Sequence, residues 1–188
     1  MAFKFYNCDG VNDKDWGCGY RCIQNVESFL KINVDSIEKI ADNLLSIGIN
    51  PFIGGKTIFT AGDRLAFCDG DWIEKYFSVF SSLSVEKLEL KQASDYLKIK
   101  DRIVENIAII IIDGGIYCIS ENSQGTLLID PHVYVEVDSI PPLSKDYSGG
   151  VGYVQMFDFL TKNMEIIGLD KNDFFLDPVV IYCIKCVE

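Results

Sequence analysis

Residues 16–31 read WGCGYRCIQNVESFLK, in which a cysteine stands between two glycines and precedes an amphipathic segment. The apolar residues of this segment recur at spacings of three and four, the period of an α-helix with one buried stripe: Cys22, Ile23, Val26, Phe29 and Leu30. The polar residues between them are expected outside that stripe: Arg21, Gln24, Asn25 and Lys31. The pattern predicts a helix from Cys18 to about Lys31, with Cys18 at its N-terminus, where free N–H groups and the helix dipole favour a thiolate.

The only histidine of the chain, His132, lies far from this segment in the sequence Asp130-Pro131-His132. In extended backbone, residues two apart project to the same face, so the Asp130 carboxylate can orient the His132 imidazole. A thiolate nucleophile needs a base within hydrogen-bond reach and a third group that orients the base. Cys18, His132 and Asp130 are therefore the candidate catalytic residues of a cysteine protease.

Length and composition favour an ordinary globular protein. The 188 residues, 48% of them hydrophobic, suit one domain spanning 1–188. The net charge of -11 argues against a nucleic-acid partner, which needs clustered Lys and Arg. Residues 1–10 lack the apolar stretch of a signal peptide, and the longest aliphatic run, 107–112, is too short to cross a bilayer. We expect a soluble, cytoplasmic monomer without membrane insertion.

The cysteines indicate packing rather than disulfides or metal binding. Seven is an odd number for a closed disulfide framework, and without a secretion signal the thiols are expected to be reduced. Cys183 and Cys186 form one Cys-x-x-Cys pair, but zinc would need two further ligands. No metal or other cofactor is expected. Four cysteines occur in apolar contexts typical of buried positions: Cys22, Cys68, Cys118 and Cys183.

Further helices are predicted from helical spacing and caps. Asp35 is a possible N-cap with Glu38 three residues later, and Gly48 is a stop, so residues 35–48 should form the second helix. The same apolar spacing predicts three more helices, over 72–83, 94–106 and 153–163.

The strands are expected mainly in the second half of the chain. Residues 107–112 form a continuous aliphatic run, as in a strand covered on both faces, and 116–120 with 126–130 are expected to form a hairpin around 122–125. Alternation from His132 to Val137 would continue the sheet past the proposed base, and 178–186 would be a final strand. Residues 141–150, bracketed by Pro-Pro and Gly-Gly, are expected to be mobile. Helices and sheet in mixed order predict an α+β fold.

Three landmarks in this order resemble a known family. The turn Trp16-Gly17-Cys18-Gly19-Tyr20-Arg21 resembles the nucleophile motif of the ubiquitin-fold modifier 1-specific proteases, and Asp130-Pro131-His132 resembles their base motif. Members also carry a tyrosine twelve residues before the cysteine, a position held here by Tyr6, which by this resemblance contributes to the oxyanion hole. The resemblance implies a papain-like fold, in which an N-terminal helix carries the nucleophile and packs against a mainly antiparallel sheet carrying the Asp-x-His. It also implies cleavage after the C-terminal glycine of a ubiquitin-like modifier.

The resemblance further implies which residues contact substrate. Trp16 would pack beside the site, and the small Gly17 and Gly19 would allow close approach of the substrate backbone. The substrate tail channel would include the segments around three more residues: Trp72, Gly114 and Gly115. The chain departs from the family pattern at Glu74, Asp113 and Val133, so the accepted modifier or its tail can differ while catalysis is intact.

Other functions remain open on the sequence. Autophagy proteases share the Trp-Gly-Cys turn and the Asp-Pro-His but have a much longer insert, whereas only 114 positions separate Cys18 from His132 here. Related lysine-63-chain deubiquitinases take their histidine from an earlier position. The alternatives to a ubiquitin-fold modifier 1 protease are the same chemistry on ubiquitin or another modifier, or a catalytically silent modifier-binding adaptor. The complete set Tyr6, Cys18, Asp130 and His132 disfavours the silent adaptor.

Overall fold

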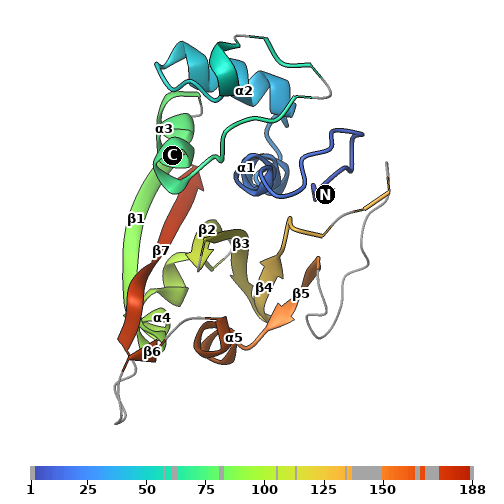
Figure 1. Ribbon diagram of the computed structural model, residues 1–188. Coiled ribbons are helices and arrows are strands. Elements are labelled where there is room, and N and C mark those ends of the chain that lie inside the picture. Colours follow the sequence, from blue (N-terminus) through green and yellow to red (C-terminus); the bar gives the residue numbers. More distant parts are fainter. Residues whose placement is uncertain are drawn as a thin grey trace.

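An antiparallel sheet separates two layers of helices in the computed structural model (Figure 1). Helices α1 to α3 lie on one side of the sheet, and α4 and α5 lie on the other. Each side has its own buried apolar cluster, one packed against α1 and one against α5. The structure describes residues 3–56, 58–60, 63–80, 83–104, 106–112, 114–133, 135–136, 150–163, 166–167 and 174–186.

The sheet has the strand order β1-β7-β2-β3-β4-β5, with β6 paired to β7, and every pairing is antiparallel. The strands are β1 Leu83–Gln92, β2 Ile107–Ile112, β3 Gly115–Asn122, β4 Gly125–Ile129, β5 Val151–Val154, β6 Ile166–Ile167 and β7 Phe174–Cys186. The α-helices are α1 Cys18–Phe29, α2 Ile37–Ser46, α3 Gly70–Phe80, α4 Tyr96–Ile99 and α5 Met156–Asn163. The antiparallel α+β architecture agrees with the prediction.

Helix α1 begins at the predicted residue, Cys18, and ends at Phe29. The prediction that its polar residues lie outside the core was wrong for Arg21, Gln24 and Asn25, which are all buried. The N-terminal segment covers that face of the helix: Asn25 Oδ1 accepts the Lys4 backbone N–H at 2.5 Å, and Asn25 Nδ2 donates to the Lys4 carbonyl at 3.0 Å. Buried polar groups are tolerated where such hydrogen bonds replace water.

Three helix predictions need correction. Ser36, not Asp35, is the N-cap of α2, and its hydroxyl accepts the Lys39 N–H at 3.1 Å. Helix α3 begins at Gly70 and ends before Leu83, which belongs to the unpredicted strand β1. The stretch predicted as a helix over 94–106 contains only the short helix α4 between two 3-10 turns.

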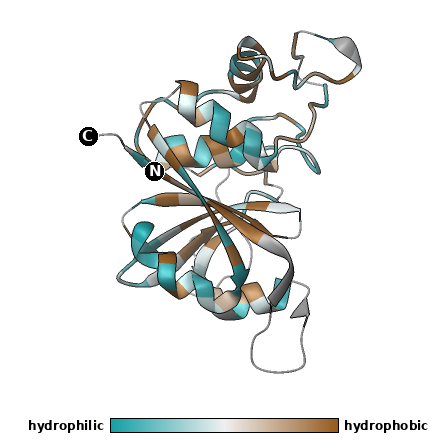
Figure 2. Ribbon diagram, turned by 90° about the vertical axis from the view of Figure 1, so that its left-hand side faces the viewer, coloured by the Kyte–Doolittle hydropathy of each residue, from teal (hydrophilic) through white to brown (hydrophobic). Residues whose placement is uncertain are grey.

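The central strands agree well with their patterns. Strand β2 is buried along almost its whole length, as predicted for an aliphatic run covered on both faces, and β3 with β4 forms the predicted hairpin. Figure 2 shows much brown in the sheet, which lies between helices of mixed colour. The final strand β7 is longer than 178–186, and β5 occupies the first part of the predicted helix over 153–163.

The predicted continuation of the sheet from His132 to Val137 was wrong for the described residues 132, 133, 135 and 136, none of which is in a strand. Strand β4 ends at Ile129, and His132 lies in a turn, because the N-terminal segment pairs with the chain there instead. The Tyr6 N–H donates to the Pro131 carbonyl at 3.2 Å, and the Val135 N–H donates to the Tyr6 carbonyl at 3.1 Å. Residues 134, 137–149 and 113 lie outside the described residues, so the mobility predicted for 141–150 is not addressed. No helix in the described part of the chain is long and apolar enough to span a membrane.

Candidate active site

The start of α1 is fixed by two close approaches within the protein. A Cβ atom on Gly17 would lie 2.3 Å from Asp13 Oδ2, and one on Gly19 would lie 2.1 Å from the Cys68 carbonyl oxygen. The segment carrying Cys68 is tied to the helix by the Tyr20 hydroxyl, which donates to the Ala66 carbonyl at 2.9 Å. Both glycines therefore make room for the protein's own segments on either side of Cys18. The sequence predicted instead that Gly17 and Gly19 allow the substrate backbone to approach.

Arg21 holds the loop before Cys18 from inside the protein. Its fully buried guanidinium binds Asp13 Oδ2 at 2.6 Å and Asp9 Oδ1 at 2.7 Å. It also donates to Gln24 Oε1 at 2.9 Å. Asp13 in turn accepts the Asn7 N–H at 2.8 Å. This network fixes the path of residues 7–16 and hence the entry of the chain into α1.

Asp130 and His132 contact each other directly, as the two-residue spacing predicts. Nδ1 of His132 lies 2.6 Å from Oδ1 of Asp130, and the His132 backbone N–H donates to the same oxygen at 3.0 Å. Asp130 is held by the residue just before β5, because its N–H donates to the Gly150 carbonyl at 2.6 Å. The carboxylate therefore fixes both the ring plane and the tautomer of the histidine, with Nδ1 protonated and Nε2 free to serve as a base.

The electrostatic surroundings favour the charged form of His132. Burial by itself lowers the pKa of His132, but hydrogen bonds with the Asp130 carboxylate and with the Cys18 side chain outweigh burial and raise the pKa from 6.5 to about 9. The Cys18 side chain is therefore a close neighbour of the imidazole, and both line the same cavity. An imidazolium held beside a thiol is the arrangement that stabilises a thiolate.

Tyr6 lies on another side of the same two residues. Its ring meets the His132 ring edge-on, with centroids 5.8 Å apart. Burial raises the pKa of the Tyr6 hydroxyl far above its usual value, and the neighbouring Cys18 raises it further. The hydroxyl is thus a neutral donor next to the sulfur at all ordinary pH values.

The three side chains open onto one cavity of about 300 Å³. Its wall contains the predicted Tyr6, Cys18, Gly114 and His132, together with three residues that the sequence did not single out: Lys14, Asp15 and Phe67. Phe67 is 44% exposed. Asp15 has the left-handed backbone angle φ of 71°. These three residues lie in loops, where no periodic pattern marks them.

The other predicted substrate contacts lie elsewhere. Trp16 is buried to 3% exposure and packs edge-on against Tyr20, with ring centroids 5.8 Å apart. Trp72 is half-buried on α3 and packs against the core, and it is not among the described residues lining the cavity. A Cβ on Gly115 would lie 2.7 Å from the Tyr117 hydroxyl oxygen, so Gly115 faces that side chain.

Comparison with known proteins identifies the fold but not a sequence family. No protein-family model and no curated protein matches the sequence. Among solved structures, the crystal structure of UfSP from C. elegans matches with a TM-score of 0.56 and 13% sequence identity. The fold is UfSP-like. The match covers 98% of this chain and 32% of the C. elegans chain, so this chain spans about a third of the length of that relative.

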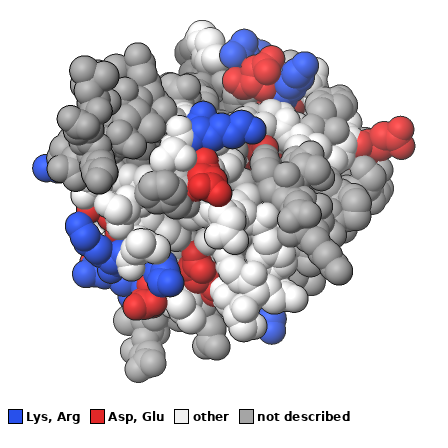
Figure 3. Space-filling view, turned by 90° about the horizontal axis from the view of Figure 1, so that it is seen from below, with Lys and Arg blue, Asp and Glu red and all other residues white. Residues whose placement is uncertain are grey.

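The described surface gives little sign of other sites. Within the described residues, no group of three His, Cys, Asp or Glu side chains could hold a metal ion. On the face shown in Figure 3, the described basic and acidic side chains lie next to one another rather than in separate areas. The four cysteines predicted from their apolar contexts are all buried. Among the described parts of the protein, the cavity at Cys18 is therefore the place where a nucleophile, a base and a hydrogen-bond donor meet.

Proposed function

We propose that this protein is a cysteine protease that cleaves after the C-terminal glycine of a ubiquitin-like modifier. The observation that carries the proposal is the single cavity onto which Cys18, His132 and Tyr6 open, with Asp130 bound to the far side of the imidazole. A nucleophile, a base and an orienting carboxylate are the groups that acyl transfer by a thiol requires. The UfSP-like fold supports a ubiquitin-like modifier as the substrate class.

In the proposed reaction, the Cys18 thiol transfers its proton to Nε2 of His132, and the resulting thiolate attacks the glycine carbonyl. The backbone N–H of Cys18 and the hydroxyl of Tyr6 donate hydrogen bonds to the oxyanion. His132 then protonates the leaving amine, and the C–N bond breaks to leave a thioester on Cys18. Water, deprotonated by His132, attacks the thioester and releases the modifier with a free carboxylate.

The proposed substrate is ubiquitin-fold modifier 1, either as a precursor that is matured or as a conjugate removed from lysine. The sequence motifs and the fold both favour this modifier over its relatives. We further propose that residues 1–188 act as one catalytic domain, as a monomer in the cytoplasm. Gly114 is the best supported of the proposed tail contacts because it borders the cavity.

Activity-based probes test the proposal directly. The protein is incubated with ubiquitin-fold modifier 1, ubiquitin and a third ubiquitin-like modifier, each carrying a C-terminal electrophile, and adducts are mapped by peptide mass spectrometry. An adduct at Cys18 with the first probe alone is the expected result, and Cys18→Ser is the control that abolishes it. An adduct with ubiquitin would change the substrate assignment, and binding without any adduct would indicate an adaptor and end the protease proposal.

A further inference from the structure

A second tyrosine contacts the histidine of the candidate active site. The ring of Tyr117 lies with its centroid 5.0 Å from that of His132, at an interplanar angle of 52°. Tyr6 meets the same imidazole edge-on from another direction. The imidazole of His132 is therefore bordered by Asp130, two aromatic rings and the Cys18 side chain. Tyr117 has no assigned part in the chemistry proposed above.

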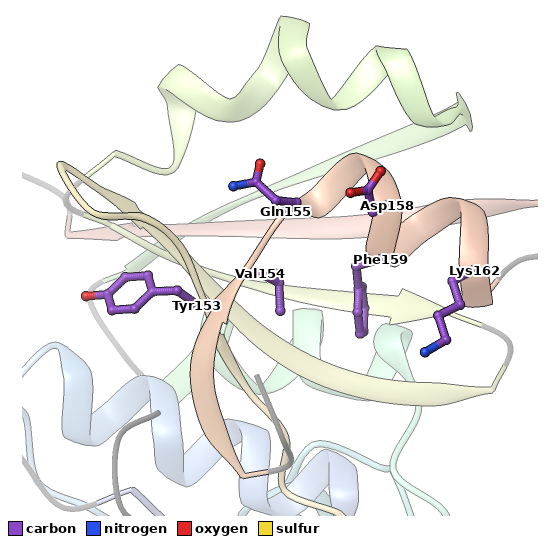
Figure 4. Close-up of a pocket in the computed structure, with 6 residues that line it drawn as sticks. All are labelled: Tyr153, Val154, Gln155, Asp158, Phe159 and Lys162. Carbon is purple, nitrogen blue, oxygen red and sulfur yellow. The ribbon is translucent and has the colours of Figure 1, made fainter. Parts of the chain in front are cut away.

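Strand β3 brings Tyr117 to this place. Cys118 pairs with Ile129, the last residue of β4, so Tyr117 lies one step further toward Asp130. The phenol ring is also supported from α5, because Phe159 meets it edge-on with ring centroids 5.9 Å apart. Figure 4 shows Phe159 projecting from α5 into the groove beside Val154 of β5. A row of rings thus extends from α5 through Tyr117 to the histidine.

Gly115 makes this position of Tyr117 possible. Residues 115 and 117 share one face of β3, and a Cβ at 115 would lie 2.7 Å from the Tyr117 hydroxyl oxygen and 2.8 Å from Cε2. Real Cβ atoms do not approach other heavy atoms this closely, so an alanine at 115 would push the phenol ring away. The room above Gly115 is occupied by Tyr117 and is not open to a substrate tail.

We propose that Tyr117 is a positioning residue, housed over Gly115 and supported by Phe159, which holds the His132 imidazole toward Cys18 and stabilises its charged form through the ring face. An aromatic face within about 6 Å of a cation attracts the cation electrostatically. The inference rests on the proposed protease function. It reassigns Gly115 from the substrate channel to the support of the base.

The charged and titratable groups around His132 all influence the pH at which its imidazole titrates. Asp130 comes from the end of β4, Cys18 from α1 and Tyr6 from the N-terminal segment. The exposed Lys14 and Asp15 border the same cavity and are of opposite charge. Substitution of Tyr117 leaves all of these groups in the protein. A change in the His132 titration can then be traced to the missing ring.

The first test follows the only histidine of the chain by NMR, which gives a single imidazole resonance to titrate. Tyr117→Leu keeps most of the side-chain volume, and hence the burial of His132, but removes the ring face. The midpoint should fall by about half a pH unit, the value expected for loss of one cation–π contact. Tyr117→Phe keeps the ring face and should titrate like the wild type. Equal midpoints for the wild type and Tyr117→Leu would overturn the inference.

The second test asks whether Gly115 makes room for the Tyr117 ring or contacts the substrate tail. Iodoacetamide is too small to need a tail channel, so its rate of reaction with Cys18, measured by peptide mass spectrometry, reports only the sulfur and the imidazole. At acidic pH, where the rate follows the small population of the thiolate–imidazolium pair, Gly115→Ala should slow this reaction by about threefold, the factor that corresponds to half a pH unit. In a Tyr117→Leu background the same substitution should have almost no further effect. If Gly115→Ala has no effect, or has the same effect in the Tyr117→Leu background, Gly115 does not act by supporting Tyr117 and the inference is overturned.

The wild-type measurements distinguish failure of the inference from failure of the proposed function. A wild-type Cys18 that reacts no faster than an ordinary thiol, beside a histidine with an ordinary midpoint, would remove the protease proposal and the positioning role together. A reactive Cys18 and a raised midpoint, both unaffected by Tyr117→Leu, would leave the protease proposal standing and remove only the role of Tyr117.

Discussion

One carboxylate oxygen of Asp130 binds His132 twice, accepting from the ring Nδ1 at 2.6 Å and from the backbone N–H at 3.0 Å. Because both contacts use Oδ1, the ring and the backbone of the histidine are fixed relative to each other. The histidine side chain is 32% exposed, so water could otherwise compete for Nδ1. Asp130 thus has two separable effects: its oxygen orients the ring, and its negative charge stabilises the imidazolium.

Asp130→Asn and Asp130→Ala separate these two effects. An amide oxygen can still accept from Nδ1 but carries no full charge, so Asp130→Asn should lower kcat by about tenfold, the low end of the range for such orienting groups. Asp130→Ala removes the orienting contact as well and should lower kcat on the order of 10²-fold, with little change in KM. Steady-state cleavage of a modifier precursor measures both constants. A loss confined to KM would place Asp130 in substrate binding instead.

The pH dependence of stability should report the raised pKa of His132, about 9 compared with the usual 6.5. A group whose pKa is raised on folding stabilises the folded state fully below its unfolded pKa. This contribution is lost as the pH rises through the folded pKa. The free energy of unfolding should therefore decrease between about pH 6.5 and 9 in the wild type and less so in His132→Gln. Urea titrations across this range provide the measurement, and parallel curves for the two proteins would contradict the assignment.

Tyr6→Phe should weaken turnover without abolishing it. The phenylalanine keeps the edge-on packing against His132 but removes the donor beside Cys18. Loss of one oxyanion donor typically reduces kcat on the order of 10²-fold. Alkylation of Cys18 by iodoacetamide involves no oxyanion and serves as the matched control. A variant with the wild-type kcat would show that the hydroxyl of Tyr6 takes no part in the transition state.

The elements with a local pattern were predictable from the sequence. The period of α1 and the two-residue spacing of Asp130 and His132 are properties of short stretches, and both agree with the structure. Long-range contacts were not predictable in this way. Periodicity marked Arg21 as an outer residue because it cannot show that Asp9 and Asp13 fold back over the helix.

Strand β1 shows a second reason why local sequence did not predict the structure. Its sequence is rich in Leu, Glu and Lys, which favour helices, and its alternation of apolar and charged residues is interrupted at Glu86 and Lys87. Pairing with the distant strand β7 decides its conformation. The cavity residues Phe67, Lys14 and Asp15 lie in loops, so only the folded chain brings them to Cys18.

Arg21 should be essential for stability although it touches no reacting atom. Its side chain and that of Asp13 are both fully buried, so Arg21→Met would leave a buried carboxylate without its partner. Breaking a buried pair in this way costs about 3–5 kcal/mol of unfolding free energy. Asp9→Asn is the matched control, because Asp9 is 31% exposed and water can replace part of its contact. Chemical denaturation should give a clearly smaller loss for Asp9→Asn, and equal losses would argue against the buried pair as the cause.

Glu27 should make the protein less stable as the pH rises from mildly acidic to neutral. Burial raises the pKa of Glu27 to about 7, although the Asp35 N–H and the Tyr76 hydroxyl, which donate to its two oxygens at 2.9 Å each, lower it in part. Between about pH 4.5 and 7 the folded state therefore binds more protons than the unfolded state, and the free energy of unfolding must fall as the pH rises.

Glu27→Gln should remove this slope, because a neutral amide can accept the Asp35 N–H without titrating. The exposed Glu38 on α2 provides the matched control, since Glu38→Gln alters the same charge without any buried contact. Urea unfolding at intervals between pH 4.5 and 7.5 compares the three proteins. The slope for His132 lies at higher pH and does not overlap with most of this range. A Glu27→Gln curve that keeps the wild-type slope would assign the pH dependence to other carboxyl groups and leave Glu27 ionised in the folded protein.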